Sequence, residues 1–329
     1  MQRKLYIFLL ALLTCFSGLQ AQELSDEARI SLLTCTPGDY LYTRYGHTAI
    51  RVLDKTNEID IVFNYGMFDF NTEHFYWKFV RGETWYELGT NSMWWFMQQY
   101  IYEKRPVYEQ VLNLTISQRD TLWQALLENN KPENCKYLYN FVFDNCATRP
   151  YWLIAKVLGD TIRSSYVGYT GQTYRSFIRH YTGPHTWENA GINLLFGPKA
   201  DQTMTSEQRL FLPEELMFYL SQATLSDGTP VVKRSHIAPF EIKSTPWYAS
   251  WEFGLALYFL LVLAVTLYDR HRKHFCPAID IIAAVPYGLL LLLVCFLTFF
   301  SCHPLVGFGW RLLILPLVHL CARIVYIIR

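Results

Sequence analysis

The stretch YLYNFVFDNCATR, residues 137–149, decides how the soluble part of this chain is organised. Its run of aromatic and apolar residues predicts a strand over 137–143, and Tyr151–Leu158 is predicted as the helix that follows. Cys146 would then stand where a strand ends and a helix begins. There the helix dipole favours a thiolate, and helix amides can hold an oxyanion. A small buried cysteine that only packs the strand end is an equally good interpretation of this stretch alone.

His47 best fits the base that a cysteine nucleophile requires. Histidine titrates near neutral pH, and His47 opens a predicted strand directly after Gly46, where a substrate can approach the backbone closely. Taken alone, a histidine in this setting is more often a structural residue. The other histidines of the soluble part lack a comparable place at the head of a strand: His74, His180, His185 and His236.

A β-hairpin is predicted from the alternating run 47–53, a polar turn and the returning run 59–65. In that register Asn64 comes close to His47, so we expect its side chain to orient the imidazole ring. A turn or edge residue is the competing interpretation of Asn64. The alternatives for this third catalytic position are Asp60 and Asp69.

The soluble part holds three cysteines, Cys35, Cys135 and Cys146, once Cys15 and the four cysteines near the C-terminus are set aside. In an oxidising compartment two of the three can pair, and one thiol then stays free. With Cys146 as the free nucleophile, we predict a disulfide between Cys35 and Cys135.

Both ends of the chain indicate export and membrane anchoring. Residues 1–21 carry two basic residues before an apolar run and end in Ala21, which is typical of a signal peptide. Residues 22–246 are predicted as a periplasmic catalytic domain, and 247–329 as a transmembrane helical domain. Three apolar runs of nearly spanning length occur in that last part, at 251–268, 278–300 and 308–328.

Basic residues set the orientation of the predicted spans. Arg270, Arg272 and Lys273 lie between the first two runs, which predicts that this loop is cytoplasmic and that residues 22–246 lie outside. We therefore expect a multi-pass protein of the inner (cytoplasmic) membrane. A hydrophobic content of 51% agrees with this, and a net charge of +1 with dispersed basic residues excludes a surface that binds nucleic acid.

Several motifs follow one another along the chain: GHTAIRV (46–52), FNYGMFDF (63–70), EQVLNLT (109–115), FVFDNCATR (141–149) and FFSCHP (299–304). By these motifs the chain resembles the Bacteroidota lipoprotein N-acyltransferases called Lnb. The order of a histidine strand, a polar strand and Asn-Cys at a helix start also resembles circularly permuted papain-like enzymes of the NlpC/P60 and lecithin:retinol acyltransferase type. Together the two resemblances imply an α+β fold, with a permuted papain-like exported domain followed by about three transmembrane helices, fewer than expected of the family.

The resemblance implies an acyltransferase with a Cys–His centre that needs no metal or cofactor. Cys146 would take an acyl chain from a membrane phospholipid as a thioester, and the α-amine of a lipoprotein's lipidated N-terminal cysteine would accept it. Asn64 takes the third, polar position of such enzymes. Arg44, Asn145 and His303 are expected to contact substrate, His303 because it follows the outward end of the second predicted span.

Two other functions stay open at this point. A papain-like cell-wall peptidase or amidase would need an open, polar groove for a large polar substrate. A non-enzymatic envelope scaffold would keep Cys146 buried and inert, and labelling with a thiol-reactive probe would separate it from both enzymes.

Overall fold

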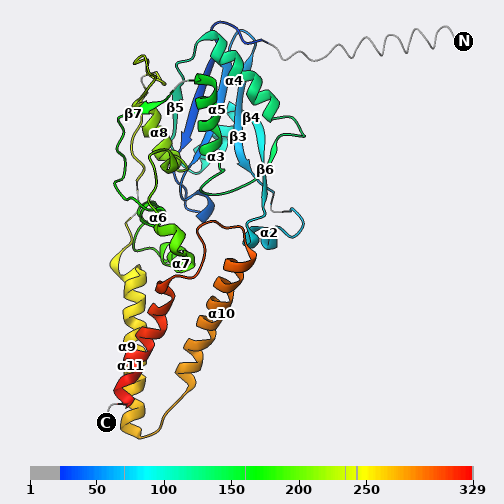
Figure 1. Cartoon of the computed structure of the whole chain (residues 1–329). Helices are drawn as coiled ribbons and strands as arrows, with labels where there is room; N and C mark the ends of the chain where they lie inside the picture. The colour runs from blue at the N-terminus through cyan, green and yellow to red at the C-terminus, as the bar shows by residue number, and fades with distance from the viewer. Residues whose placement is uncertain (1–22, 70, 160, 234, 242–243, 328–329) are drawn as a thin grey trace, which may run out of the picture.

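The computed structural model describes residues 23–69, 71–159, 161–233, 235–241 and 244–327, so the signal peptide predicted for residues 1–21 lies outside the described residues. The first part of the chain forms a six-stranded antiparallel sheet with helices on both faces, and long helices extend from one end of it (Figure 1). The strands, in their order across the sheet, are β5 (Val107–Val111), β1 (Arg29–Cys35), β2 (His47–Asp54), β3 (Ile59–Met67), β4 (Trp85–Ser92) and β6 (Lys136–Leu138).

The predicted hairpin is confirmed as β2 and β3. Ile50 pairs with Phe63 across the two strands. Continued by one residue, this register sets Asn64 opposite Ala49. Because side chains two residues apart on a strand share a face, His47 and Asn64 are diagonal neighbours on the same side of the sheet.

The two faces of the sheet build separate parts of the core. Leu32 and Leu33, which are adjacent in β1, are both fully buried but belong to different hydrophobic clusters. The face of Leu33 is covered by α3 (Met93–Tyr102). The face of Leu32 is covered by α4 (Ile116–Asn129), α5 (Thr148–Leu158) and α8 (Pro213–Ser221).

The strand predicted over 137–143 is wrong beyond Leu138, where β6 ends. Asn140 reverses the chain, because its side-chain oxygen accepts two backbone amide hydrogens and its backbone exchanges two hydrogen bonds with Asp144. Cys146 therefore follows a tight turn and lies directly before α5, instead of at the end of a long strand.

Among the described residues, two helices are long and apolar enough to cross a membrane, α9 (Trp251–Arg272) and α10 (Ala278–Phe300). They correspond to the first two predicted spans. In the third predicted span, 308–328, the 3-10 helix η5 (Trp310–Leu313) runs directly into α11 (Ile314–Ile327), where the described residues end. This third span stays a prediction.

A buried ionic cluster joins the three helices at the end remote from the sheet. Arg323 of α11 is 6% exposed, and its guanidinium donates to Asp269 of α9 at 3.0 Å and to Asp280 of α10 at 2.9 Å. His319 of α11 binds the same Asp280 at 2.6 Å. Charges in such apolar surroundings are tolerated when they are paired, so the cluster fixes the three helices relative to one another.

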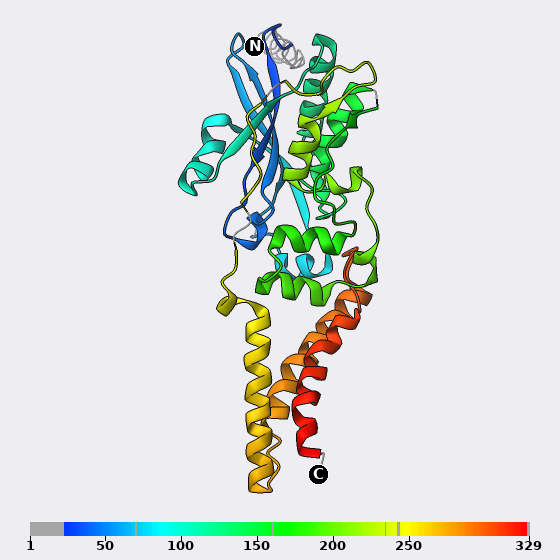
Figure 2. The ribbon, with the colours of Figure 1, turned by 90° about the vertical axis from the view of Figure 1, so that its left-hand side faces the viewer.

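Three short helices lie between the sheet and the membrane helices (Figures 1 and 2). The end of the sheet at which β1 finishes and β2 begins points toward them, and His47 is the first residue of β2. The three helices are α2 (Phe75–Arg81), α6 (Tyr174–Thr182) and α7 (Trp187–Leu195).

The loop 301–309 between α10 and α11 fastens the membrane helices to the sheet domain. On one side, the amide of Cys302 donates to the carbonyl oxygen of Arg81 at the end of α2, at 2.7 Å. On the other side, the amide of Gly307 donates to the carbonyl oxygen of Leu195 at the end of α7, at 3.0 Å. The loop is therefore held between two short helices beneath the sheet.

Candidate active site

His47, Asn64 and Cys146 come together at the membrane end of the sheet. Nε2 of His47 and Oδ1 of Asn64 are 2.5 Å apart, so the ring donates this hydrogen to the amide oxygen. The other ring nitrogen is left for the sulfur of Cys146, with which the His47 side chain forms a hydrogen bond. Strand β2, strand β3 and the turn before α5 each supply one of the three residues.

The electrostatics of the sulfur–imidazole pair favour a thiolate. Burial raises the pKa of Cys146, but the charge and the hydrogen bond of His47 outweigh it, so this pKa lies below its ordinary value. Burial lowers the pKa of His47, but the thiolate and the hydrogen bonds to Cys146 and Asn64 outweigh it, so this pKa lies above its ordinary value. Both shifts act in the same direction, because each charged partner stabilises the other, and together they favour the thiolate–imidazolium form of the pair.

Backbone amides contribute unequally to the site. The amides of Thr48 and Cys146 donate to the sulfur and lower its pKa. Those of Ala147 and Thr148, at the start of α5, donate to Oδ1 of Asn145 at 2.8 and 3.0 Å. The expectation that helix amides hold an oxyanion is therefore wrong for these two, because both are already occupied. The dipole of α5 still acts on Cys146, which lies just before the helix.

Asn145 fixes the position of its neighbour Cys146. It is 2% exposed, and its amide nitrogen donates to the carbonyl oxygens of Phe141 and Phe211 at 2.7 and 2.8 Å. Because its oxygen accepts two helix amides, both ends of the side chain are satisfied within the protein. These bonds favour a positioning role, and the contact of Asn145 with substrate stays a prediction.

Gly66 is a part of the site that the sequence analysis did not identify. Its φ is +92°, at a point where the pairing of β3 with β4 shifts register as in a β-bulge. A Cβ at this position would lie 3.6 Å from Cβ of Cys146 and 4.0 Å from Cε1 of His47. The glycine thus keeps space open beside the pair. A glycine beside a strand can signal a bulge or a close approach, and Gly66 directly follows the predicted strand 59–65.

Tyr137 brings an unpaired hydroxyl group to the same space. The residue is 4% exposed, and its hydroxyl has no hydrogen-bond partner among the described residues. The hydroxyl lies 3.8 Å from the point where a Cβ on Gly66 would stand. The guanidinium carbon of Arg149 lies 3.6 Å from the centre of the tyrosine ring. Buried hydroxyls are normally paired, so this one is available to a group that enters beside the sulfur.

Arg44 and His303 each tie a loop to one of the short helices. Arg44 forms an ion pair with Glu188 of α7 at 3.3 Å. Nε2 of His303 donates to the carbonyl oxygen of Phe79 in α2 at 3.0 Å. Their contact with substrate stays a prediction.

The predicted disulfide between Cys35 and Cys135 is wrong, because both are free thiols. Cys35 ends β1 and Cys135 directly precedes β6, so three strands lie between them. With about 4.8 Å between neighbouring strands, the two residues are far beyond the roughly 4.4–6.8 Å between Cα atoms that a disulfide requires. Burial raises the pKa of the Cys35 thiol to about 12, which keeps it protonated although it pairs with His47 in the sheet register.

The arrangement brings together a thiol whose pKa is lowered, an imidazole that is held in place, and an unpaired hydroxyl beside the same space. Such a set suits acyl transfer through a thioester. Within the described ranges, no group of three or more histidine, cysteine, aspartate or glutamate side chains is placed to hold a metal ion.

Comparison with known families covers most of the chain. The model of the Lnb N-terminal periplasmic domain matches residues 18–182, and that of the Lnb transmembrane domain matches residues 244–329. Searches of curated proteins and of solved structures found no match. The first matched region holds the six strands of the sheet and the helices as far as α6, and the second holds α9, α10 and α11. The chain therefore belongs to the Lnb family, and it is a membrane protein whose N-terminal domain lies in the periplasm.

Proposed function

We propose that the chain is a lipoprotein N-acyltransferase of the inner membrane, with Cys146 as nucleophile and His47 as base. Membership of the Lnb family implies lipoprotein N-acylation, with a phospholipid as donor and a lipoprotein as acceptor. The observation that carries the proposal is the half-buried, hydrogen-bonded pair of Cys146 and His47, whose shifted pKa values favour a thiolate. Asn64 orients the imidazole through its bond to Nε2.

In the first half-reaction, the thiolate of Cys146 attacks the ester carbonyl carbon of a phospholipid. A C–S bond forms, and the carbonyl oxygen becomes an oxyanion. When the oxyanion collapses, the C–O ester bond breaks and the imidazolium of His47 gives its proton to the departing alkoxide. The products are a thioester on Cys146 and a lysophospholipid.

In the second half-reaction, the neutral α-amine of a lipoprotein's lipidated N-terminal cysteine attacks the thioester carbonyl. His47, now neutral, takes the proton that the amine loses. The C–S bond breaks, and the sulfur leaves as the thiolate that the imidazolium stabilises. An amide is formed, and the resting pair is restored.

The oxyanion of both half-reactions requires hydrogen-bond donors beside the sulfur. The amides of Ala147 and Thr148 are occupied, whereas the hydroxyl of Tyr137 is buried and unpaired. We assign this hydroxyl to the oxyanion, and the space beside Gly66 to the acyl carbonyl group.

The order of the three residues in the chain supports a relationship to circularly permuted papain-like enzymes. His47 and Asn64 come from neighbouring strands and precede Cys146, which lies at the start of a helix packed on the sheet. The site also lies at the end of the sheet that points to the membrane helices (Figure 1). Both lipid substrates of the proposed reaction are confined to the membrane that these helices enter.

The proposal is tested by mass spectrometry of lipoprotein N-termini in cells that lack this gene. Native chain and Cys135→Ser should restore the N-acyl group, because Cys135 lies outside the site as a free thiol. Cys146→Ser should be present in the membrane in equal amount and should restore nothing. N-acylation by the Cys146→Ser variant would overturn the assignment. Unchanged lipoprotein termini in the deletion strain, with altered cell-wall peptides, would favour a peptidase or amidase instead.

A further inference from the structure

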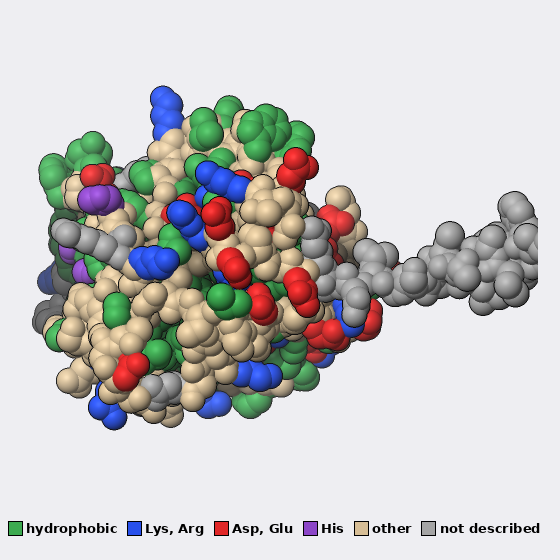
Figure 3. Space-filling view, turned by 90° about the horizontal axis from the view of Figure 1, so that it is seen from above, with side chains coloured by type: hydrophobic (Ala, Val, Ile, Leu, Met, Phe, Trp, Pro, Cys, Tyr) green, Lys and Arg blue, Asp and Glu red, His purple; other side chains and the backbone are tan. Residues whose placement is uncertain are grey.

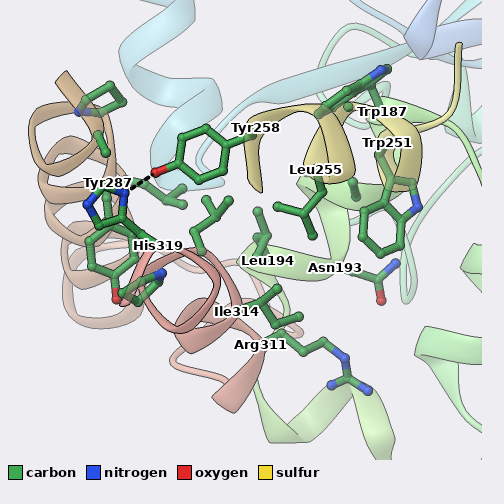
Figure 4. A pocket seen from close by; sticks show the side chains of 18 of the residues that line it. Trp187, Asn193, Leu194, Trp251, Leu255, Tyr258, Tyr287, Arg311, Ile314 and His319 are labelled. Atoms are coloured by element: carbon green, nitrogen blue, oxygen red, sulfur yellow. Dashed lines mark hydrogen bonds between the residues drawn. The ribbon is translucent and has the colours of Figure 1, made fainter. Parts of the chain in front are cut away.

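A large apolar pocket lies between the short helices and the membrane helices. Its volume is about 1170 Å³, and it is lined by residues of α6, α7, α9, α10, η5 and α11. Leu194, Leu255 and Ile314 occupy its middle (Figure 4). Tyr258 and His319, joined by a hydrogen bond of 2.7 Å, mark the deep end.

The opposite end of the pocket carries excess positive charge. Arg175, Arg179 and Arg311 all line it. The buried Arg175 is fully engaged, because it binds Asp201 at 2.7 Å and several backbone carbonyl oxygens. Arg311 reaches Asp201 only at 3.8 Å, and the exposed Arg179 has no ion pair within the described residues. Two of the three guanidinium groups thus share the carboxylate of Asp201, and Arg179 is unpaired among the described residues, which leaves two positive charges at this end to be balanced by an anion.

The pocket runs along the membrane helices from the sheet domain to the ionic cluster. Along α11 it extends from Ile314 to Arg323, about 14 Å at 1.5 Å per residue, and Asp280 and Arg323 line its far end. Three tryptophans line the pocket, and this residue type gathers at membrane–water boundaries. They are Trp187, at the start of α7, Trp251, at the start of α9, and Trp310, at the start of η5.

We propose that this pocket binds a glycerophospholipid of the periplasmic leaflet, with its phosphate between Arg179 and Arg311 and an acyl chain along the apolar middle. Guanidinium groups bind phosphate through paired hydrogen bonds, and the two uncompensated charges stand where a headgroup would lie. The inference rests on the proposed function, for which this lipid is the acyl donor. It assigns a holding site for that donor beneath the cysteine–histidine pair.

The first test measures binding without turnover. Full-length chain carrying Cys146→Ser is held in detergent micelles, and equilibrium binding of labelled dioleoylphosphatidylglycerol is compared with that of dioleoylglycerol, which lacks the phosphate. The double change Arg179→Ala and Arg311→Ala should weaken binding of the phospholipid at least tenfold and leave the diacylglycerol unaffected. Arg163→Ala, an exposed arginine outside the pocket, is the matched control and should bind as the parent chain does.

The second test fills the pocket. Leu255→Trp puts an indole into its middle, whereas Leu257→Trp puts one on the exposed side of the same helix. The first variant should lose phospholipid binding, and the second should retain it. If a helix of a second copy occupies the pocket instead, Leu255→Trp will change the oligomeric mass and leave lipid binding intact, which overturns the proposal.

The outcomes separate this inference from the proposed function. Parent-like phospholipid binding by both the double arginine variant and Leu255→Trp overturns the pocket assignment, even if lipoproteins are still N-acylated. Preferential binding of a diacylated lipopeptide, unaffected by the arginine changes, overturns it as well. Arginine-dependent phospholipid binding in a chain that N-acylates no lipoprotein upholds the lipid site and refutes the acyltransferase.

Discussion

Replacement of His47 by alanine tests the sulfur–imidazole pair directly. The change removes the charge and the side-chain hydrogen bond that lower the pKa of Cys146, and it leaves the burial that raises this pKa. Burial is the largest single influence on the thiol, and the amides of Thr48 and Cys146 lower its pKa less than the charge or the hydrogen bond of His47 does. The pKa of Cys146 in the variant should therefore exceed the value of about 8.5 found for an unperturbed cysteine.

The size of the effect follows from the thiolate fraction. A thiol with the ordinary pKa of about 8.5 is roughly 1% thiolate at pH 6.5, and each unit of lowering raises this fraction up to tenfold. Native Cys146 has a lowered pKa, so its thiolate is lost only as the pH falls through that lowered value. In the variant the fraction at pH 6.5 should be below roughly 1%, and alkylation should be slower than in the native chain by up to tenfold for each unit by which the pKa of Cys146 rises.

The assay is the rate at which iodoacetamide alkylates Cys146, measured by mass spectrometry of its peptide at a series of pH values. His185→Ala is the matched control, because this exposed histidine binds Glu252 at 2.8 Å outside the site. The control should reproduce the native profile. Identical pH profiles for the native chain and the His47→Ala variant would refute the pairing of His47 with Cys146.

Three further changes examine the surroundings of the pair. Tyr137→Phe removes only a hydroxyl, so alkylation of Cys146 should be unchanged. Acyl transfer should fall by about 10²–10³-fold, as it does when an enzyme loses one oxyanion donor. A native rate of acyl transfer would exclude Tyr137 as that donor. Gly66→Ala forces a φ of +92° on alanine and should lower the free energy of unfolding by about 1–2 kcal/mol. The change is measured as a lower melting temperature, and an unchanged melting temperature would contradict the strain. His303→Ala should weaken acyl transfer without slowing alkylation of Cys146, because the loop loses its bond to the carbonyl oxygen of Phe79. Native transfer in this last variant would show that the loop merely joins two helices.

Local patterns were sufficient for much of the fold. The alternation on either side of a polar turn predicted β2 and β3, and the helix predicted over Tyr151–Leu158 lies within α5. The resemblance to the Lnb family, based on ordered motifs, is confirmed.

Long-range contacts were beyond the sequence patterns. The odd number of cysteines in the soluble part suggested that two of them form a disulfide. The strand order across the sheet, however, separates Cys35 from Cys135. The space beside the sulfur is formed by Gly66 and Tyr137, which come together only when β3, β4 and β6 pair. Asn145 occupies helix amides that the position of Cys146 alone suggested were free. Each of these features depends on the pairing of distant segments.

The ionic cluster of the membrane helices imposes an order on biosynthesis. Asp269 precedes its partner Arg323 by 54 residues, so the ribosome completes α9 and α10 well before the arginine exists. Until then the carboxylates of Asp269 and Asp280 lack their cation at the membrane, where unpaired charge is costly. The three helices can therefore lock together only after residue 323 has been translated and inserted, and a chain stalled earlier presents two unmatched acidic groups to the cell's quality control.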